Sequence, residues 1–316
     1  MKQLLLLIKI LFSTIILFVL FTIIFWGYRD IPLDELKAQY APTPSDFISV
    51  NGMEVHYRDE GSQQDSLPLV LIHGTGSSLH IFDAWTDNLK QNYRVVRMDL
   101  PGYGLTGPFP DRDYSMDHYV DFFKQFLDAL HIEKCIIGGN SLGGRIAWGF
   151  TVAHPETVEK LILIDAAGYP SQAKSTPLAF RAARIPVLNQ MFTFITPPFL
   201  ARKSVENVYH DKRRVTETLA NRYFELTLRE GNRQSFVDRM NTTYNPEAYI
   251  QIKQIQSPTL ILWGEQDLLI PIENAYRFQE DLPNDTLVIL PEVGHVPMEE
   301  SPEVSLEAVV DFLKEE

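Results

Sequence analysis

Short apolar runs and helix-forming segments alternate along the chain from residue 46 onward. The first two runs flank Asn51-Gly52, a dipeptide that accepts the positive φ angles of a type I′ turn, so they predict a β-hairpin. A helix-forming segment at residues 116–130 follows the N-cap candidate Ser115, and similar segments separate other apolar runs. This alternation of strands and helices predicts a mostly parallel sheet with helices on both faces. The six further runs that read as buried strands are residues 69–72, 93–98, 135–137, 161–164, 260–263 and 287–290.

One long segment, residues 167–257, interrupts this alternation. It is too long for a structureless loop in a compact domain, so it predicts a helical cap inserted after the sixth strand. The segment holds 13 Lys and Arg against 7 Asp and Glu, whereas the whole chain has a net charge of −13, so the cap is basic on an acidic protein. We interpret its arginines as a solvated face, although a basic apolar cap near a membrane could also contact anionic lipid.

An apolar and aromatic cluster in the cap is the candidate wall of a substrate pocket for an acyl or aromatic group. In the alternative interpretation these side chains pack the cap onto the core, and both interpretations stay open because a pocket wall and a core both need apolar side chains. The residues of this cluster are Met191, Phe192, Phe194 and Phe199.

The N-terminus carries a second strong signal. No residue from 10 to 26 is charged, and residues 4–8 extend this apolar run past Lys9 to roughly 35 Å of helix, which spans a bilayer. Lys2 and Lys9 precede the helix and acidic residues follow it, so the positive-inside rule predicts a single-pass anchor with a cytoplasmic N-terminus and a catalytic domain in the periplasm or outside the cell. The alternative is secretion after signal cleavage, which fits less well because the run is long and no A-x-A-like site follows it.

The pentapeptide GNSLG at residues 139–143 joins the apolar run at residues 135–137 to a helix-forming run. A serine on such a sharp strand-to-helix turn projects its hydroxyl above the sheet edge, and only small neighbours let the strand and the helix approach closely. The bare G-x-S-x-G pattern also occurs in ordinary Gly-rich turns. The flanking strand and helix make Ser141 the candidate nucleophile.

A serine hydroxyl needs a base and an acid that orients this base. His295 follows the last apolar run on a loop and is the preferred base, whereas the other seven histidines are interpreted as surface or locally bonded residues. Asp267 follows the run at residues 260–263 on a loop and is the preferred acid. Asp165 ends the run at residues 161–164 and is a rival carboxylate, which we interpret mainly as a partner of loop amides.

The donors for an oxyanion are expected from the loop HGTG at residues 73–76, which directly follows an apolar run. The expected pair is the backbone N–H of Leu142, the residue after the candidate nucleophile, and the backbone N–H of Thr75. Gly76 on the same loop is the alternative to Thr75. His73 is interpreted as structural, with its ring bonded to the loop.

Together these motifs resemble the successive motifs of an α/β-hydrolase. They are HGTG, the stretch DLPGYG at residues 99–104, GNSLGG, the aspartate in WGEQD and the histidine in GHVP. Within that superfamily the chain resembles cap-bearing esterases, monoacylglycerol-lipase-like enzymes and carbon–carbon bond hydrolases. The resemblance implies a sheet of the eight-stranded type, a triad of Ser141, Asp267 and His295, and no cofactor. Haloalkane dehalogenases and epoxide hydrolases of this fold have aspartate at the elbow, so Ser141 argues against both.

The composition excludes other classes of function. A hydrophobic content of 45% is ordinary for a globular enzyme, and a net charge of −13 without a Lys/Arg-rich block makes nucleic acid an unsuitable partner. The single cysteine, Cys135, stands in an apolar strand and can form no internal disulfide. No Cys/His cluster in the sequence indicates a metal site.

These features predict a membrane-tethered serine hydrolase that cleaves carboxylic esters with an apolar acyl group, acting on a small-molecule ester or a lipid. Lactonase, carbon–carbon bond hydrolase and acyltransferase share the triad and stay open as alternatives. A catalytically silent hydrolase-fold binding protein is the alternative outside enzymes. The expected organisation is a membrane anchor at residues 1–28, a linker at 29–45, the hydrolase core at 46–166 and 258–316, and the cap at 167–257.

Overall fold

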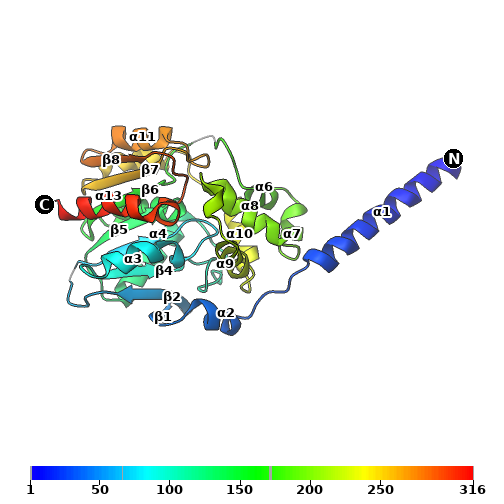
Figure 1. The fold of residues 1–316 in the computed structure, drawn as a ribbon, viewed down its shortest axis with the longest axis horizontal. Coiled ribbons are helices and arrows are strands. Elements are labelled where there is room, and N and C mark those ends of the chain that lie inside the picture. Colours follow the sequence, from blue (N-terminus) through cyan, green and yellow to red (C-terminus); the bar gives the residue numbers. More distant parts are fainter. Residues whose placement is uncertain (1, 66, 171–172, 316) are drawn as a thin grey trace.

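The computed structural model describes residues 2–65, 67–170 and 173–315, and its centre is one eight-stranded sheet (Figure 1). The strand order is β1-β2-β4-β3-β5-β6-β7-β8, in which β2 runs antiparallel to β1 and β4 and the other neighbours are parallel. The mostly parallel sheet expected from the apolar runs is therefore confirmed. Its strands are β1 (Ser45–Val50), β2 (Met53–Glu60), β3 (Leu69–Ile72), β4 (Val95–Met98), β5 (Cys135–Asn140), β6 (Val158–Ile164), β7 (Thr259–Gly264) and β8 (Asp285–Leu290).

The hairpin of β1 and β2 turns at Asn51 and Gly52, whose φ angles of 49° and 77° are those of the predicted type I′ turn. The central strands are buried on both faces, which is why they read as continuous apolar runs. Successive residues of β3 point to opposite faces of the sheet, Val70 into one buried cluster and Leu71 into the other.

Each face of the sheet has its own layer of helices, as predicted (Figure 1). One layer consists of α4 (Met116–Ala129), α5 (Leu142–Ala153) and α11 (Glu273–Asp281), which share a cluster of buried aromatic and aliphatic residues. The layer on the other face consists of η1 (Leu79–Phe82), α3 (Asp83–Leu89), α12 (Pro297–Glu300) and α13 (Pro302–Lys314).

The cap is inserted between β6 and β7, after the sixth strand, and it is helical as expected. It lies on the side of the sheet from which α1 projects (Figure 1). Its helices are α6 (Leu178–Ala183), α7 (Leu188–Phe192), α8 (Pro198–Val208), η2 (Lys212–Arg214), α9 (Glu217–Thr227), α10 (Asn232–Asn241) and η3 (Ala248–Gln254).

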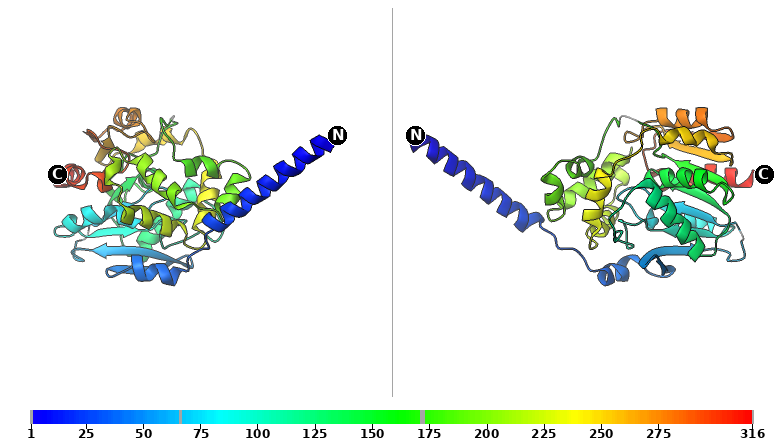
Figure 2. Two further views of the ribbon diagram at one scale, coloured as in Figure 1. Left: turned by 45° about the vertical axis from the view of Figure 1, so that its right-hand side comes forward. Right: turned by 180° about the vertical axis from the view of Figure 1, so that it is seen from behind.

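The N-terminal helix α1 (Lys2–Trp26) stands away from the body in both views of Figure 2. It is long and apolar enough to cross a membrane, and a signal sequence near an N-terminus would satisfy the same test. The helix is therefore a candidate membrane span.

The stretch expected to be a linker, residues 29–45, is corrected by the structure, because it contains the packed helix α2 (Leu33–Tyr40). Leu36 and Tyr40 of this helix are buried against Leu105 and Leu226. Prolines at residues 32, 42 and 44 are typical of a linker, but here they flank the helix: Pro32 occupies its N-cap position and Pro42 follows its C-cap.

Candidate active site

Ser141 lies on the turn between β5 and α5 with φ 54° and ψ −112°, a region that residues other than glycine rarely adopt. Its backbone N–H donates to Ile164 O at 3.1 Å, which ties the turn to the end of the neighbouring strand. The flanking glycines are required, because a Cβ on Gly139 would lie 2.3 Å from the carbonyl carbon of Gly143 and one on Gly143 would lie 2.1 Å from Ile72 O. The strained turn places Ser141 in the wall of a cavity between the sheet and the cap.

His295 follows β8 and Asp267 follows β7, so both loops leave the same edge of the sheet. The structure brings them together, with His295 Nδ1 2.6 Å from Asp267 Oδ2 and both side chains buried. Asp267 Oδ1 accepts hydrogen bonds from the backbone amides of Leu269 at 2.8 Å and Ile270 at 2.9 Å. Since these amides orient the carboxylate and Oδ2 holds Nδ1, the Nε2 atom of His295 is the ring nitrogen left to accept a proton.

Ser141 and His295 line the same cavity. Among the described residues no hydrogen bond joins Ser141 Oγ to the imidazole ring. Hydrogen bonds between a nucleophile and its base are often long in unliganded enzymes and shorten when substrate binds. The arrangement can therefore support proton transfer from Ser141 to His295 in a complex with substrate.

Asp165, the rival carboxylate, is fully buried beside Asp267. Its Oδ1 accepts from the Gly264 amide at 3.0 Å, whereas its Oδ2 has no N–H or hydroxyl donor among the described residues. Burial, and then the negative charge of Asp267, raises the pKa of Asp165 well above its usual value. Asp165 therefore stays protonated where Asp267 is ionised, and its proton can form a hydrogen bond with the Asp267 carboxylate.

Asp165, Asp267 and His295 also form a group, within the described part of the chain, whose ligand atoms lie within 4.8 Å of one another and could hold a metal ion. Both oxygens of Asp267 and one of Asp165 are already engaged, by the His295 ring and by backbone amides. We therefore interpret the group as an acid–base site and not as a metal centre.

The loop at residues 73–76 packs against the elbow, since a Cβ on Gly74 would lie 3.0 Å from Ser141 Cβ. The backbone N–H groups of Thr75 and Leu142 donate to no protein acceptor among residues 2–65, 67–170 and 173–315, so both are free to bind an oxyanion. The ring of His73 lies with Nδ1 2.7 Å from Gly74 O, and burial lowers its pKa. His73 is therefore neutral and bonded to the loop.

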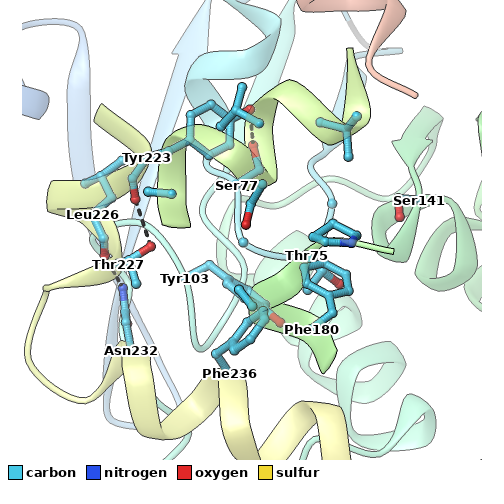
Figure 3. A pocket seen from close by; sticks show the side chains of 18 of the residues that line it. Thr75, Ser77, Tyr103, Ser141, Phe180, Tyr223, Leu226, Thr227, Asn232 and Phe236 are labelled. Atoms are coloured by element: carbon cyan, nitrogen blue, oxygen red, sulfur yellow. Dashed lines mark hydrogen bonds between the residues drawn. The ribbon is translucent and has the colours of Figure 1, made fainter. Parts of the chain in front are cut away.

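Most of the remaining cavity wall comes from the cap and is mainly apolar, and core residues such as Tyr103, Leu269 and Val296 complete it. In Figure 3, Thr75 lies near Ser141, and Tyr223 lies on the opposite side of the cavity, at the upper left of the view. Phe180 and Phe236 lie between them, below the centre. The helices α6 to α10 all contribute to this wall, through side chains that include Phe180, Phe192, Leu200, Val205, Leu226 and Phe236.

Of the four cap residues expected in a pocket wall, Phe192 lies in this wall and the other three do not. Phe192 is buried at the end of α7, with its ring centroid 5.6 Å from that of Phe236. Phe194 and Phe199 are 70% and 50% exposed, and Met191 is half-buried outside the cavity. The expectation is corrected for these three. Met191 precedes Phe192 on α7 and points about 100° away from it around the helix axis. Phe194 lies beyond the end of α7 and Phe199 lies on α8, so neither shares the face of Phe192.

Sequence reasoning missed Asn140, the residue before the candidate nucleophile. Its Nδ2 donates to His295 O at 2.9 Å and to Ile164 O at 3.2 Å, so it fastens the elbow to the loop that carries the imidazole. The available signal was a polar side chain at the end of an otherwise apolar strand.

Sequence reasoning also missed Glu300, which is 1% exposed. Its carboxylate accepts from the amide of Gly294 at 2.8 Å and from the amide of Asp211 at 2.7 Å, so it joins the histidine loop to the cap. His295 N adds a bond to Val208 O at the end of α8, at 2.8 Å. No local sequence pattern indicates a role for Glu300, because its hydrogen-bond partners lie on two segments that are distant from each other in the chain.

Comparison with known proteins matches residues 68–302 to the family described as alpha/beta hydrolase fold. The chain is 29% identical to the 2-hydroxy-6-oxo-6-(2'-aminophenyl)hexa-2,4-dienoic acid hydrolase of Metapseudomonas resinovorans, over 84% of this chain and 90% of that protein. A solved meta-cleavage product hydrolase from Pseudomonas fluorescens IP01 is similar with a TM-score of 0.73 and 26% identity, covering 85% of this chain and 97% of that one. A solved bacterial membrane phospholipase A has a TM-score of 0.73 and 25% identity, covering 99% and 98%.

Proposed function

The chain belongs to the alpha/beta hydrolase fold family and is a hydrolase, and we propose that within this family it is a serine hydrolase of carboxylic esters with apolar acyl groups. One observation carries the proposal. Ser141, His295 and Thr75 lie in the same cavity whose remaining wall is mainly apolar cap side chains. This cavity combines the groups needed for acyl transfer with a surface that suits a hydrocarbon chain.

In the proposed reaction Ser141 Oγ attacks the ester carbonyl while His295 Nε2 takes its proton. Asp267 holds the ring and stabilises the imidazolium, and the amides of Thr75 and Leu142 donate to the oxyanion. His295 then protonates the departing alcohol, which leaves an acyl-enzyme on Ser141. A water molecule, deprotonated by His295, attacks the acyl carbonyl and releases the carboxylic acid.

Carbon–carbon bond hydrolysis is the second candidate, because the relative that is 29% identical is a hydrolase of a dienoic acid and the solved structure that is 26% identical is a meta-cleavage product hydrolase. A substrate of that kind brings a carboxylate into the cavity. The described residues that line the cavity include no Lys or Arg, and a buried carboxylate without a cation is costly. This lining favours a neutral ester over an anionic dienoate.

Labelling with a fluorophosphonate probe and turnover of p-nitrophenyl esters test the proposal. We expect the probe to attach to Ser141 and the esters to be hydrolysed. A catalytically silent binding protein would give neither result. Turnover of a dienoate at a higher kcat/KM than any ester would favour carbon–carbon bond hydrolysis instead.

Acyl chain length should set the rate. Because each buried methylene contributes about 0.8 kcal/mol, two added carbons should raise kcat/KM roughly tenfold until the cavity is filled. Phe192→Ala should flatten this dependence and leave acetate hydrolysis nearly unchanged, whereas Phe194→Ala, two residues away and exposed, should keep the wild-type profile. Equal losses on every chain length in Phe192→Ala would show that this ring only packs the cap.

We also propose that α1 tethers the enzyme to a membrane, with the N-terminus in the cytoplasm and the catalytic domain in the periplasm or outside the cell. The end of α1 is bonded to the cap, since Thr196 N donates to Trp26 O at 3.0 Å and Tyr28 N donates to Phe194 O at 3.2 Å. Arg233 binds Asp30 at 2.7 Å just beyond the helix. These contacts support an uncleaved helix whose C-terminal end is fixed to the cap.

Full-length protein should therefore resist release from membranes by alkaline carbonate, and a chain that starts at Trp26 should appear in the supernatant. The shortened chain keeps the contacts of Tyr28 and Asp30 with the cap and should remain an active hydrolase. Recovery of a soluble mature protein from the full-length gene, with a new N-terminus after Trp26, would show instead that the segment is a cleaved signal.

A further inference from the structure

Six large apolar side chains are exposed along the cap segment that contains α6, α7 and the start of α8. Concentrations of exposed apolar side chains mark interaction sites on soluble proteins, so this segment is a candidate binding surface. We call these side chains the outer cap residues. They are Leu178, Ile185, Val187, Leu188, Phe194 and Phe199, with exposures of 52%, 47%, 70%, 43%, 70% and 50%.

The end of α1 lies directly beside two of these residues. The ring of Trp26 is 5.9 Å from the ring of Phe199 in an edge-on contact, and Phe194 O accepts from Tyr28 N. Figures 1 and 2 show the same proximity of α1 to the cap from three directions. If α1 crosses a bilayer, Trp26 marks its surface, because Trp and Tyr concentrate at the interface. The outer cap residues then lie at the same surface.

The charge of this segment fits an anionic surface. Residues 170–205 contain five Lys and Arg and no Asp or Glu, in a chain with a net charge of −13. Three of the five pair with acidic side chains from other positions. Arg181 and Arg184 are exposed and form no ion pair with any described residue, so they are free to bind lipid phosphates.

The same helices line the catalytic cavity from inside. Phe180 stands beside Arg181 on α6 and Phe192 ends α7, and both lie in the cavity wall. Only the thickness of one helix layer therefore separates the outer cap residues from the space beside Ser141.

We propose that the outer cap residues insert into an anionic phospholipid leaflet and that the substrate is an ester lipid taken from this leaflet. The inference rests on the proposed hydrolase activity and on the proposed tether. Apolar side chains enter the boundary between headgroups and acyl chains, as in interfacial helices, while Arg181 and Arg184 bind phosphates above them. A second copy of the chain fits this surface less well, because two basic faces would repel each other.

Fluorescence of the full-length protein in lipid nanodiscs tests the docking without any need for turnover. Val187→Cys and Phe194→Cys are labelled with a polarity-sensitive dye, and Tyr276→Cys on α11, also exposed, is the matched control. The native Cys135 is buried and does not compete for the dye. In discs of phosphatidylcholine and phosphatidylglycerol we expect quenching by spin-labelled lipid at positions 187 and 194 and none at 276. Equal exposure of all three dyes to water, or protection without lipid quenching as in a dimer, would overturn the proposal.

A second experiment tests the role of the two arginines in docking. Arg181→Gln and Arg184→Gln should each lower the ratio of docked to undocked protein about fivefold in phosphatidylglycerol discs and little in pure phosphatidylcholine. Hydrolysis of soluble p-nitrophenyl butyrate should stay unchanged, since neither residue lines the cavity. Quenching that is independent of these arginines would refute the anionic leaflet as the occupant. Absence of all ester turnover with intact quenching would refute the proposed hydrolase activity, and with it the ester-lipid substrate, but not the docking. Release of the full-length chain from membranes would refute the tether.

Discussion

Ser141→Ala should abolish ester hydrolysis, with a loss in kcat on the order of 10⁴- to 10⁶-fold, and His295→Ala should lose a similar amount. Without the hydroxyl no acyl-enzyme forms, and without the imidazole the hydroxyl keeps its proton. The double variant should be scarcely worse than either single variant, because a nucleophile and its base act as one unit and their losses do not add.

Both variants should stay folded, which makes the kinetic result interpretable. Alanine at position 141 adopts the same φ of 54° at a strain similar to that of serine, and the glycines around it are unchanged. At position 295 the backbone contacts remain, since the bonds of His295 N to Val208 and of Asn140 to His295 O do not involve the ring. Thermal unfolding provides the control. Substantial residual turnover in Ser141→Ala, in a preparation free of other esterases, would refute Ser141 as the nucleophile.

Much of the fold was predictable because the central strands are buried on both faces, so that each appears as a continuous apolar run. The elbow was predictable from local sequence. Ser141 stands between a buried strand and a helix and is flanked by Gly139 and Gly143, and few backbone conformations are compatible with such a close approach of strand and helix. The helix at residues 33–40 was not predicted, because its prolines suit a linker as well as the two ends of a helix.

The parts of the site that the sequence did not reveal depend on contacts between distant segments. Asp165 and Asp267 are 102 residues apart in the chain and become neighbours only because β6 pairs with β7 in the sheet. The cap residues show the same limit. Phe192 and Phe194 are equally apolar in sequence, yet Phe192 ends α7 and lies in the cavity wall, whereas Phe194 lies in the turn beyond that helix and is 70% exposed.

Asp267→Asn should lower kcat by about 10³- to 10⁴-fold, whereas Asp165→Asn should stay within a few-fold of wild type. To keep accepting from the Leu269 and Ile270 amides, the new side chain at 267 must turn its NH₂ group toward His295 Nδ1. That contact requires an unprotonated Nδ1, so the proton moves to Nε2 and the ring can no longer accept the Ser141 proton.

Asparagine at position 165 can make the same hydrogen bonds as the protonated Asp165 carboxyl group. Its carbonyl oxygen can still accept from the Gly264 amide, and its NH₂ group can donate to Asp267 where the Asp165 proton did.

Burial beside Asp267 raises the pKa of Asp165 in the folded state, so the folded protein holds a proton that the unfolded chain releases above pH of about 3.9. The stability contributed by Asp165 is therefore present at low pH and is lost as pH rises toward the raised pKa. Relative to wild type, the Tm of Asp165→Asn should increase between pH 4.5 and pH 8. If Asp165→Asn were instead crippled and Asp267→Asn nearly normal, the two carboxylates would have to exchange roles.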